Sequence, residues 1–311
     1  MRYLLKKLLT LVVTLFVISF LSFAAFEMIG DPVNTILGTH ATPEAAAELR
    51  AQLGLDRSLP VRYGEWILHF FAGDYGTSYI YRMPVREMIS GKLGNTLVLV
   101  LLGVLMTVGI AIPLGTYTAR KEGSAVDRFL TVFNQILMAV PPFFVAILLT
   151  LLFGLVLRIF TPGAFVSWSV SPWRFFLYMI FPALSLALPR VAMTVKMLRS
   201  SVLSEMNEDY IRTAYSRGHG RRSALKMHAL RNALLPVVSF LAANVAEMLA
   251  GGIVIEQIFS VPGIGRLLMV SISNRDIPVV EAIVMILAIW VMLIHLIGDI
   301  LSQVLDPRVR L

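Results

Sequence analysis

The sequence predicts an all-α polytopic membrane protein with six transmembrane helices. Its 311 residues are 57% hydrophobic and only 15% charged, whereas soluble globular domains are about 45–50% apolar and about 25% charged. Six long apolar stretches follow one another along the chain, and basic residues gather in alternate loops between them. This composition excludes a soluble globular protein and a disordered one.

Cysteine and histidine usage narrows the chemistry further. The chain has no cysteine and five histidines, which excludes a disulfide framework, a thiolate metal site and a cysteine nucleophile. The formal charge of +8 would suggest nucleic-acid binding in a soluble protein. In a membrane protein it reflects basic loops on the cytoplasmic side. We therefore expect no metal site and no nucleic-acid partner.

Each apolar stretch is long enough to cross a bilayer, because a membrane-spanning helix needs about 20 mostly apolar residues. The first stretch has the basic start of a signal peptide, but its apolar run continues to residue 29, well beyond the roughly 7–15 residues of a signal core. We expect an uncleaved span. The six predicted spans cover residues 8–29, 96–119, 129–157, 175–195, 234–255 and 282–301.

The distribution of basic residues predicts that both termini are cytoplasmic. With this orientation, sixteen Lys and Arg residues lie in the inside segments and four lie in the two short outside loops. Excess Lys and Arg in short loops marks the cytoplasmic side. The chain therefore divides into residues 1–29 (the N-terminus and first span), an external loop over 30–95, and a five-helix core over 96–311.

The external loop is too long to be a plain connection. Thr42, Pro43 and Glu44 read as the start of a helix, and Gly54 as its stop. A second amphipathic helix follows, with an aromatic face that we expect to lie against the outer membrane surface. The loop either packs over the bundle or forms a docking surface for an external partner. The aromatic face consists of Trp66, Ile67, Phe70 and Phe71.

The cytoplasmic segment 200–235 is polar and basic but retains a helical pattern. Ile211, Ala214 and Tyr215 share one helical face, and Gly218 is a natural helix stop. A second helix over 223–235 leads to Pro236. The short helix either lies on anionic lipid or inserts into a groove on a cytoplasmic partner. In the second case the small side chain of Ala214 allows close approach of the partner.

Polar residues within the spans are candidates for the transport path, because ionisable groups at membrane depth usually face the interior of a bundle. Glu247, with Gly251 and Gly252, is the best candidate for lining such a path, the alternative being a buried structural carboxyl. Arg190 is expected to extend its side chain to the cytoplasm. Kinks are expected in spans three and four at Pro141, Pro142, Pro182 and Pro189.

The cytoplasmic segment resembles that of ABC importer permeases of the peptide/nickel group. Against the general importer signature, only Ala214, Gly218 and Leu230 match, and Arg231 stands where that signature has proline. The group's own version, DY-x-RTA-x-x-x-G followed by HALRNALLP, is present over 209–236. Further group-like pieces occur in order: GDP at 30–32, LGLD at 53–56, GDYGTSY at 73–79, IFSVPGIGRL at 258–267, NRDIPVV at 274–280 and LDPR at 305–308.

The resemblance implies a type I ABC importer permease in the bacterial inner membrane. Its partners would be a second, homologous permease, two ATP-binding subunits, an extracellular solute-binding protein and membrane lipid. The cytoplasmic segment would couple this chain to the ATPases. No cofactor is expected on this chain, while ATP and Mg²⁺ would bind the partner subunits. The coupling residues would be Tyr210, Ile211, Ala214, Tyr215, Gly218, Leu230 and Arg231.

Two other classes of function are weighed against this one. A secondary transporter or channel working without ATPases should show inverted repeats, and the two halves show none that can be read. A membrane enzyme lacks support, since the chain has no phosphate-binding loop, zinc-binding HExxH helix or G-x-S-x-G motif. Peptides are the broadest expectation for the cargo, with nickel or metal chelates as the alternative suggested by the short loop between spans three and four.

Overall fold

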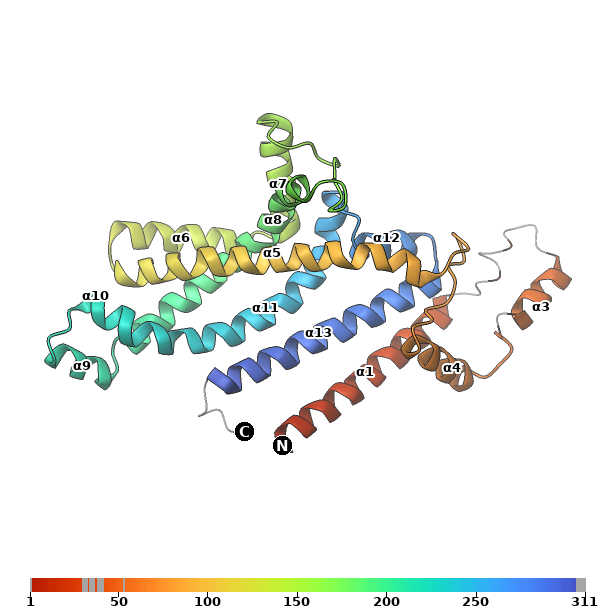
Figure 1. Cartoon of the computed structure of the whole chain (residues 1–311), viewed down its shortest axis with the longest axis horizontal. Helices are drawn as coiled ribbons and strands as arrows, with labels where there is room; N and C mark the ends of the chain where they lie inside the picture. The colour runs from red at the N-terminus through yellow and green to blue at the C-terminus, as the bar shows by residue number, and fades with distance from the viewer. Residues whose placement is uncertain (1, 30–32, 34–36, 38–41, 53, 306–311) are drawn as a thin grey trace. The chain divides into compact units, whose positions relative to one another are not determined.

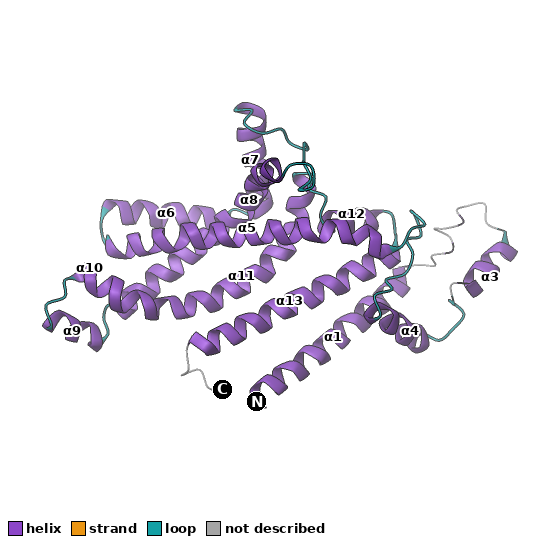
Figure 2. Cartoon of the chain, in the orientation of Figure 1, coloured by secondary structure: helices purple, strands orange, loops and turns teal. Residues whose placement is uncertain are grey.

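The structure is a computed structural model that describes residues 2–29, 33, 37, 42–52 and 54–305. Within these ranges it is helical (Figure 1) and has no strand (Figure 2). One isolated bridge joins Thr77 and Pro84. Five helices are long and apolar enough to cross a membrane, or six if one sharply bent pair is a single span. The predicted all-α membrane fold is confirmed. Of the sequence motifs, residues 30–32, 53 and 306–308 lie outside the described residues.

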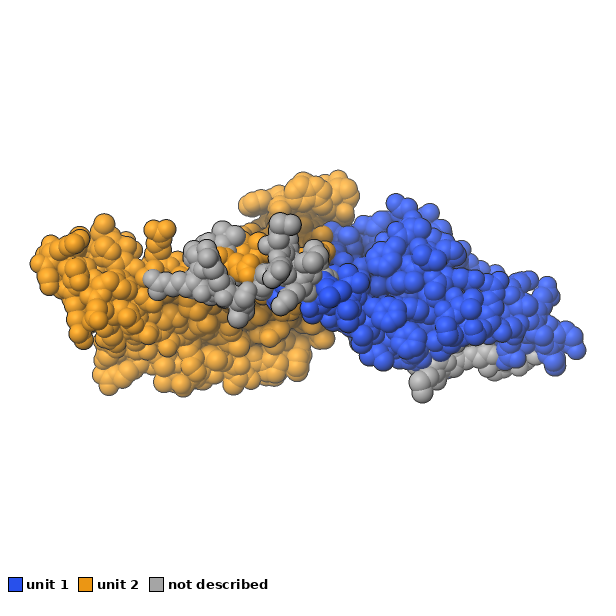
Figure 3. Space-filling model, turned by 90° about the horizontal axis from the view of Figure 1, so that it is seen from below, with its two compact units in different colours: residues 1–95, 262–292 blue, residues 96–261, 293–311 orange. Residues whose placement is uncertain are grey.

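The chain forms two compact units (Figure 3). Unit 1 comprises Met1–Asn95 and Pro262–Met292, and unit 2 comprises Thr96–Val261 and Leu293–Leu311. The sequence did not predict that residues 262–292 group with the N-terminal part. The helices of unit 1 are α1 (Arg2–Ile29), α3 (Pro43–Gln52), α4 (Leu59–Phe71), α12 (Ile264–Ser273) and the beginnings of α5 (Val85–Arg120) and α13 (Ile277–Leu305).

The predicted boundaries of the loop helix α3 are confirmed. Thr42 Oγ1 accepts a hydrogen bond from the backbone N–H of Ala45 (3.3 Å), and Glu44 lies in the first turn. Gly54, just beyond the helix, has a φ of +67°, which favours glycine because it has no Cβ. Local sequence signals were sufficient here because the N-cap and the stop involve only neighbouring residues.

Helix α4 packs on α1 through aromatic side chains. Tyr63 is buried, and its hydroxyl forms a 2.7 Å hydrogen bond with Ser19 Oγ. Trp66 lies 5.6 Å from Phe23, measured between ring centroids. Phe71, at the end of the predicted aromatic face, is 63% exposed. Part of that face is therefore used within the chain. The α1 rings around Tyr63 are Phe16, Phe20 and Phe23.

A buried carboxylate joins residues 262–292 to the loop before α5. Asp276 is 0% exposed and accepts hydrogen bonds from Ser78 Oγ (2.5 Å) and from the backbone N–H of Tyr79 (3.0 Å). Burial of a carboxylate is costly unless it is hydrogen-bonded. These bonds across almost 200 residues of sequence explain why the two segments form one unit.

Unit 2 is a bundle in which α5, α8 and α11 surround the apolar core. One core cluster joins Ala119 of α5, Leu198 and Val202 of α8, and Ala233 and Val237 of α11. The helices of this unit are α6 (Ala125–Ala139), α7 (Pro142–Leu149), α8 (Pro172–Glu205), α9 (Asp209–Ser216), α10 (Arg221–Ala224) and α11 (Leu230–Ile258), with π-helical turns η2 (Thr150–Val156) and η3 (Leu225–Ala229), and the ends of α5 and α13.

The predicted third span is a bent pair of helices. Helix α6 and the continuous run of α7 and η2 meet at an angle of 102°. Val140 and Pro141 have extended backbones, with ψ of 121° and 146°, because a residue that precedes proline avoids the helical conformation. The Pro141–Pro142 pair thus produces a sharp break rather than a kink. Helix α8, by contrast, continues through Pro182 and Pro189.

Two predicted boundaries differ from the structure. The helix of the second span begins at Val85 rather than near residue 96, so the last eleven residues of the expected loop are helical. The helix predicted over 223–235 begins at Arg221 and continues through Pro236, since α10, η3 and α11 follow one another without a break.

Candidate functional site

Helix α9 is amphipathic, and its apolar side faces the chain itself. Ile211 is 0% and Ala214 is 6% exposed, while Tyr215 is 40% exposed. The sequence placed all three on one face toward lipid or a partner. For Ile211 and Ala214 the structure differs, because both are buried within the chain, Ile211 against Ala224 and Ala229. The apolar neighbours of Ile211 are Met206, Ala224 and Ala229. The exposed residues of α9 are Asp209, Tyr210, Arg212, Thr213, Tyr215 and Ser216.

Tyr210 anchors α9 to the helices on either side. Its hydroxyl donates a hydrogen bond to Glu205 of α8 and accepts one from Asn232 Nδ2 of α11 (3.2 Å). Burial, and after it the hydrogen bond to Glu205, raises the pKa of Tyr210 to about 12. The hydrogen bond that the phenol donates to Glu205 is therefore retained to a higher pH than the ordinary pKa of tyrosine would allow.

The end of α9 depends on Gly218. Its φ is +86°, and its backbone N–H donates to the carbonyl of Tyr215 (2.9 Å), while that of His219 donates to Ala214 (3.1 Å). These bonds satisfy carbonyls at the end of the helix, and the left-handed residue that allows them is usually glycine. The predicted helix stop is confirmed. We use the name α9 segment for residues 209–220.

Leu230 and Arg231 begin α11 and have different surroundings. Leu230 is partly buried against the core cluster that includes Ala119 and Leu225. Arg231 is exposed. Of the two residues, Arg231 is the more accessible to another protein.

A charged pair lies at the middle of two helices in unit 2. Arg190 of α8 forms an ion pair with Glu247 of α11, and its Nη1 lies 3.4 Å from Asn244 Oδ1. The Glu247 side chain is 59% exposed and that of Arg190 only 17%. The expectation that Arg190 extends to the cytoplasm is therefore wrong, because a partner at the same depth neutralises its charge.

Glu247 belongs to an exposed stripe of mostly small and polar residues along α11. Gly251, one turn further, is partly exposed, and a Cβ at this position would lie 3.6 Å from Leu186 Cδ2 of α8. Gly252 is buried. Helix α6 differs, since its exposed residues include several large apolar side chains, among them Phe129, Val132, Phe133 and Ile136. The α11 stripe consists of Ser239, Ala243, Glu247, Ala250, Val254 and Gln257.

Sequence reasoning missed several buried carboxylates, among them Asp127, Asp276 and Glu256. Asp127 pairs with Arg199, Asp276 bonds to Ser78, and Glu256, which is 0% exposed, accepts a hydrogen bond from Thr96 Oγ1 (2.5 Å). Each is a single acid near a helix end, a signal that the sequence does not distinguish from a solvated charge. Within the described part of the chain, no group of three or more His, Cys, Asp or Glu residues could hold a metal ion.

Comparison with known proteins shows which family this chain belongs to. Residues 111–311 match the family described as binding-protein-dependent transport system inner membrane component, and residues 1–100 match the N-terminal model of the same kind. The chain belongs to this family. It is a multi-pass inner-membrane permease, and it is a non-catalytic subunit of an ABC importer.

Relatives of the permease cover its whole length. A putative peptide transport system permease of Brucella abortus is 35% identical over 98% of both chains. A probable peptide ABC transporter permease of Sinorhizobium fredii is 32% identical over 99% of both. A glutathione transport system permease of Salmonella paratyphi A is 32% identical over 100% of this chain and 99% of its own. These similarities place the permease in the peptide group of ABC importers.

Proposed function

We propose that this permease passes peptides from an extracellular solute-binding protein into the cytoplasm, paired with a second permease and driven by two ATP-binding subunits. ATP and Mg²⁺ would bind those subunits. The observation that supports the cargo most directly is the full-length similarity to permeases named for peptide and glutathione transport. Peptides are thus favoured over nickel or metal chelates.

The α9 segment is the proposed contact with an ATP-binding subunit. It offers an exposed polar and aromatic surface, while Ile211 and Ala214 hold it to the chain from behind. A segment attached by buried contacts can pass a push on its exposed face to the bundle. In this arrangement Tyr215 and Arg212 are contact residues, whereas Ile211 and Ala214 are supporting residues.

The exposed stripe of α11 is the proposed wall of the transport path. An ion pair at membrane depth whose carboxylate is 59% exposed would be costly in contact with lipid hydrocarbon. Of the residues in the stripe only Val254 is large and apolar, whereas α6 exposes several such side chains. Water, cargo and the second permease are therefore the environment that suits Glu247.

Orientation is the remaining part of the proposal: both termini and the α9 segment are cytoplasmic, as the basic residues of the short loops suggest. Cysteines introduced singly at Glu48 and Ser223 of this cysteine-free chain test it. A membrane-impermeant maleimide should label position 48 in intact cells and position 223 only in inverted vesicles. Labelling of both positions from the same side would contradict the six-span arrangement.

Uptake by the reconstituted importer tests the function itself. Proteoliposomes containing both permeases and the ATP-binding subunits, supplied with the solute-binding protein, should take up labelled peptide with ATP and not without it. Glu247→Gln should lower uptake about tenfold, the factor that about 1.4 kcal/mol represents. Glu87→Gln, at an exposed glutamate of α5 outside the stripe, is the matched control. Uptake of nickel but not of peptide would refute the proposed cargo, and normal uptake by Glu247→Gln would refute the proposed wall.

A further inference from the structure

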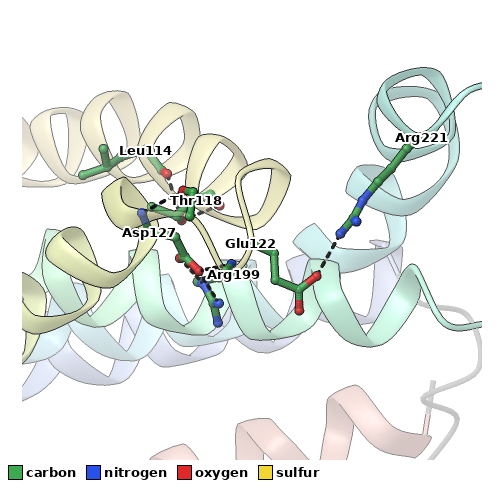
Figure 4. A network of polar contacts seen from close by, with 9 residues as sticks. Leu114, Thr118, Glu122, Asp127, Arg199 and Arg221 are labelled. Atoms are coloured by element: carbon green, nitrogen blue, oxygen red, sulfur yellow. Dashed lines mark hydrogen bonds and ion pairs between the residues drawn. The ribbon is translucent and has the colours of Figure 1, made fainter.

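The turn between α5 and α6 is fastened to α8 by a buried ion pair (Figure 4). Both carboxylate oxygens of Asp127 accept hydrogen bonds from Arg199, Oδ1 from Nε and Oδ2 from Nη2, each at 2.8 Å. Asp127 is only 3% exposed. Two parallel charge-assisted bonds fix the direction as well as the distance between the two groups.

The same carboxylate shapes the turn. The backbone N–H of Gly123 donates to Asp127 Oδ2 (3.0 Å), and Ser124 Oγ accepts from the backbone N–H of Asp127 (3.2 Å). Gly123 has a φ of +75°, so the turn has a conformation that suits glycine. A displacement of this turn is therefore carried to α8 through Arg199.

One side chain of the turn reaches the α9 segment. Glu122 Oε2 lies 2.8 Å from Arg221 Nη2, although 99 residues separate them in the sequence. Figure 4 shows the two side chains pointing toward each other from the turn and from α10. Arg221 directly follows the α9 segment and is the first residue of α10.

We propose that Glu122 and Arg221 are a positioning pair that couples movement of the α9 segment to the α5–α6 turn and, through Asp127 and Arg199, to α8. The proposal rests on the proposed contact between the α9 segment and an ATP-binding subunit. Hydrogen bonds of Tyr210 attach α9 directly to α8 and α11, and the contacts around Ile211 are apolar and therefore non-directional. The chain of ion pairs adds a directional connection between the segment that is pushed and the helices that must move.

The exposure of the pair explains why it suits this role. The side chains of Glu122 and Arg221 are 45% and 58% exposed, and an exposed ion pair contributes little to folding stability. Salt also screens such a pair far more than a buried one. Removal of the pair should therefore leave the fold and the assembly intact and change the efficiency of coupling.

The test uses the complete reconstituted importer with the solute-binding protein and a labelled peptide. The measured quantity is peptide taken up per ATP hydrolysed. Arg221→Gln and Glu122→Gln should each lower this ratio about two- to fivefold, the range that follows from the energies of exposed ion pairs. The exchanged double variant E122R/R221E should restore it. Arg222→Gln, at the exposed neighbouring arginine, should match the wild type.

The possible negative results distinguish failure of the positioning role from failure of the proposed function. A ratio for Arg221→Gln equal to that of Arg222→Gln, or no recovery in the exchanged double variant, would overturn the positioning role while peptide import stands. A wild-type complex without ATP-dependent uptake would refute the proposed function, and the positioning role with it. If Glu122→Gln failed to assemble, Arg221→Gln and the exchanged variant would still decide the question.

Discussion

Replacement of Gly218 by serine perturbs the backbone of the α9 segment without a steric clash. The position that a Cβ would take has no atom within 4 Å, and φ is +86°. The cost is therefore that of the left-handed conformation, about 1–2 kcal/mol for a residue with a Cβ. That energy corresponds to a factor of about 5–30 in an equilibrium. This conformation permits the hydrogen bonds that end α9. The substitution should therefore destabilise the conformation of the surface proposed to contact the ATP-binding subunit.

The affinity between the permease and its ATP-binding subunits measures this effect. In a titration of those subunits against permease in nanodiscs, Gly218→Ser should raise the apparent Kd by about 5–30-fold. Gly218→Asn should weaken it less, because asparagine tolerates the left-handed region. Gly220→Ser is the matched control, since Gly220 has a φ of −73° and an open Cβ position at the N-cap of α10, where serine is favoured.

Two results would refute this reasoning. Wild-type affinity for Gly218→Ser would show that the left-handed turn does not limit the docking of the α9 segment. An equal loss for Gly218→Asn and Gly218→Ser would show that space next to a partner, rather than backbone conformation, limits this position. A loss for Gly220→Ser as large as that for Gly218→Ser would point to general disruption of the segment.

Two further predictions concern α9 and the bundle. The pKa of Tyr210 is raised to about 12, whereas an unfolded tyrosine titrates near 10. The stability that this proton contributes should therefore be lost as pH rises between about 10 and 12. In thermal unfolding of the solubilised permease, Tyr210→Phe should not show this loss. A Cβ at Gly115 would lie 3.1 Å from Leu198 Cδ2, so Gly115→Leu should cost about 1–3 kcal/mol by overpacking. Gly109→Leu, at an exposed glycine with an open Cβ position, should not lower the unfolding temperature, because leucine is the better helix former and meets no neighbour there.

The third span shows which structural features the sequence pattern predicts and which it does not. The apolar run over 129–157 is long enough for one straight helix, and Pro141 and Pro142 predict an irregularity in it. The angle of 102° between the two halves was not predictable. Proline removes a backbone donor and restricts the preceding residue, but the direction taken by the chain after the break depends on what the second half packs against.

The apolar face of α9 shows the same limit of sequence-based prediction for the candidate functional site. Helical periodicity correctly grouped Ile211 with Ala214, and it does not state what an apolar face contacts. Both residues are buried within the chain, Ile211 against Ala224 and Ala229 of the helices that follow α9, so the surface left for a partner is the polar one. A short amphipathic helix can satisfy its apolar side with its own chain or with another protein, and periodicity is identical in the two cases.

The sequence by itself determined the features that depend on neighbouring residues or on composition. These are the membrane class, the apolar helices, the N-cap at Thr42 and the turn at Gly218. Only the tertiary structure decided which charges meet, as in the pairs Arg190–Glu247 and Asp127–Arg199. The physical reason is that a charge that is buried or at membrane depth requires a partner. A partner 57 or 72 residues away is selected by how the helices pack, which no local pattern encodes.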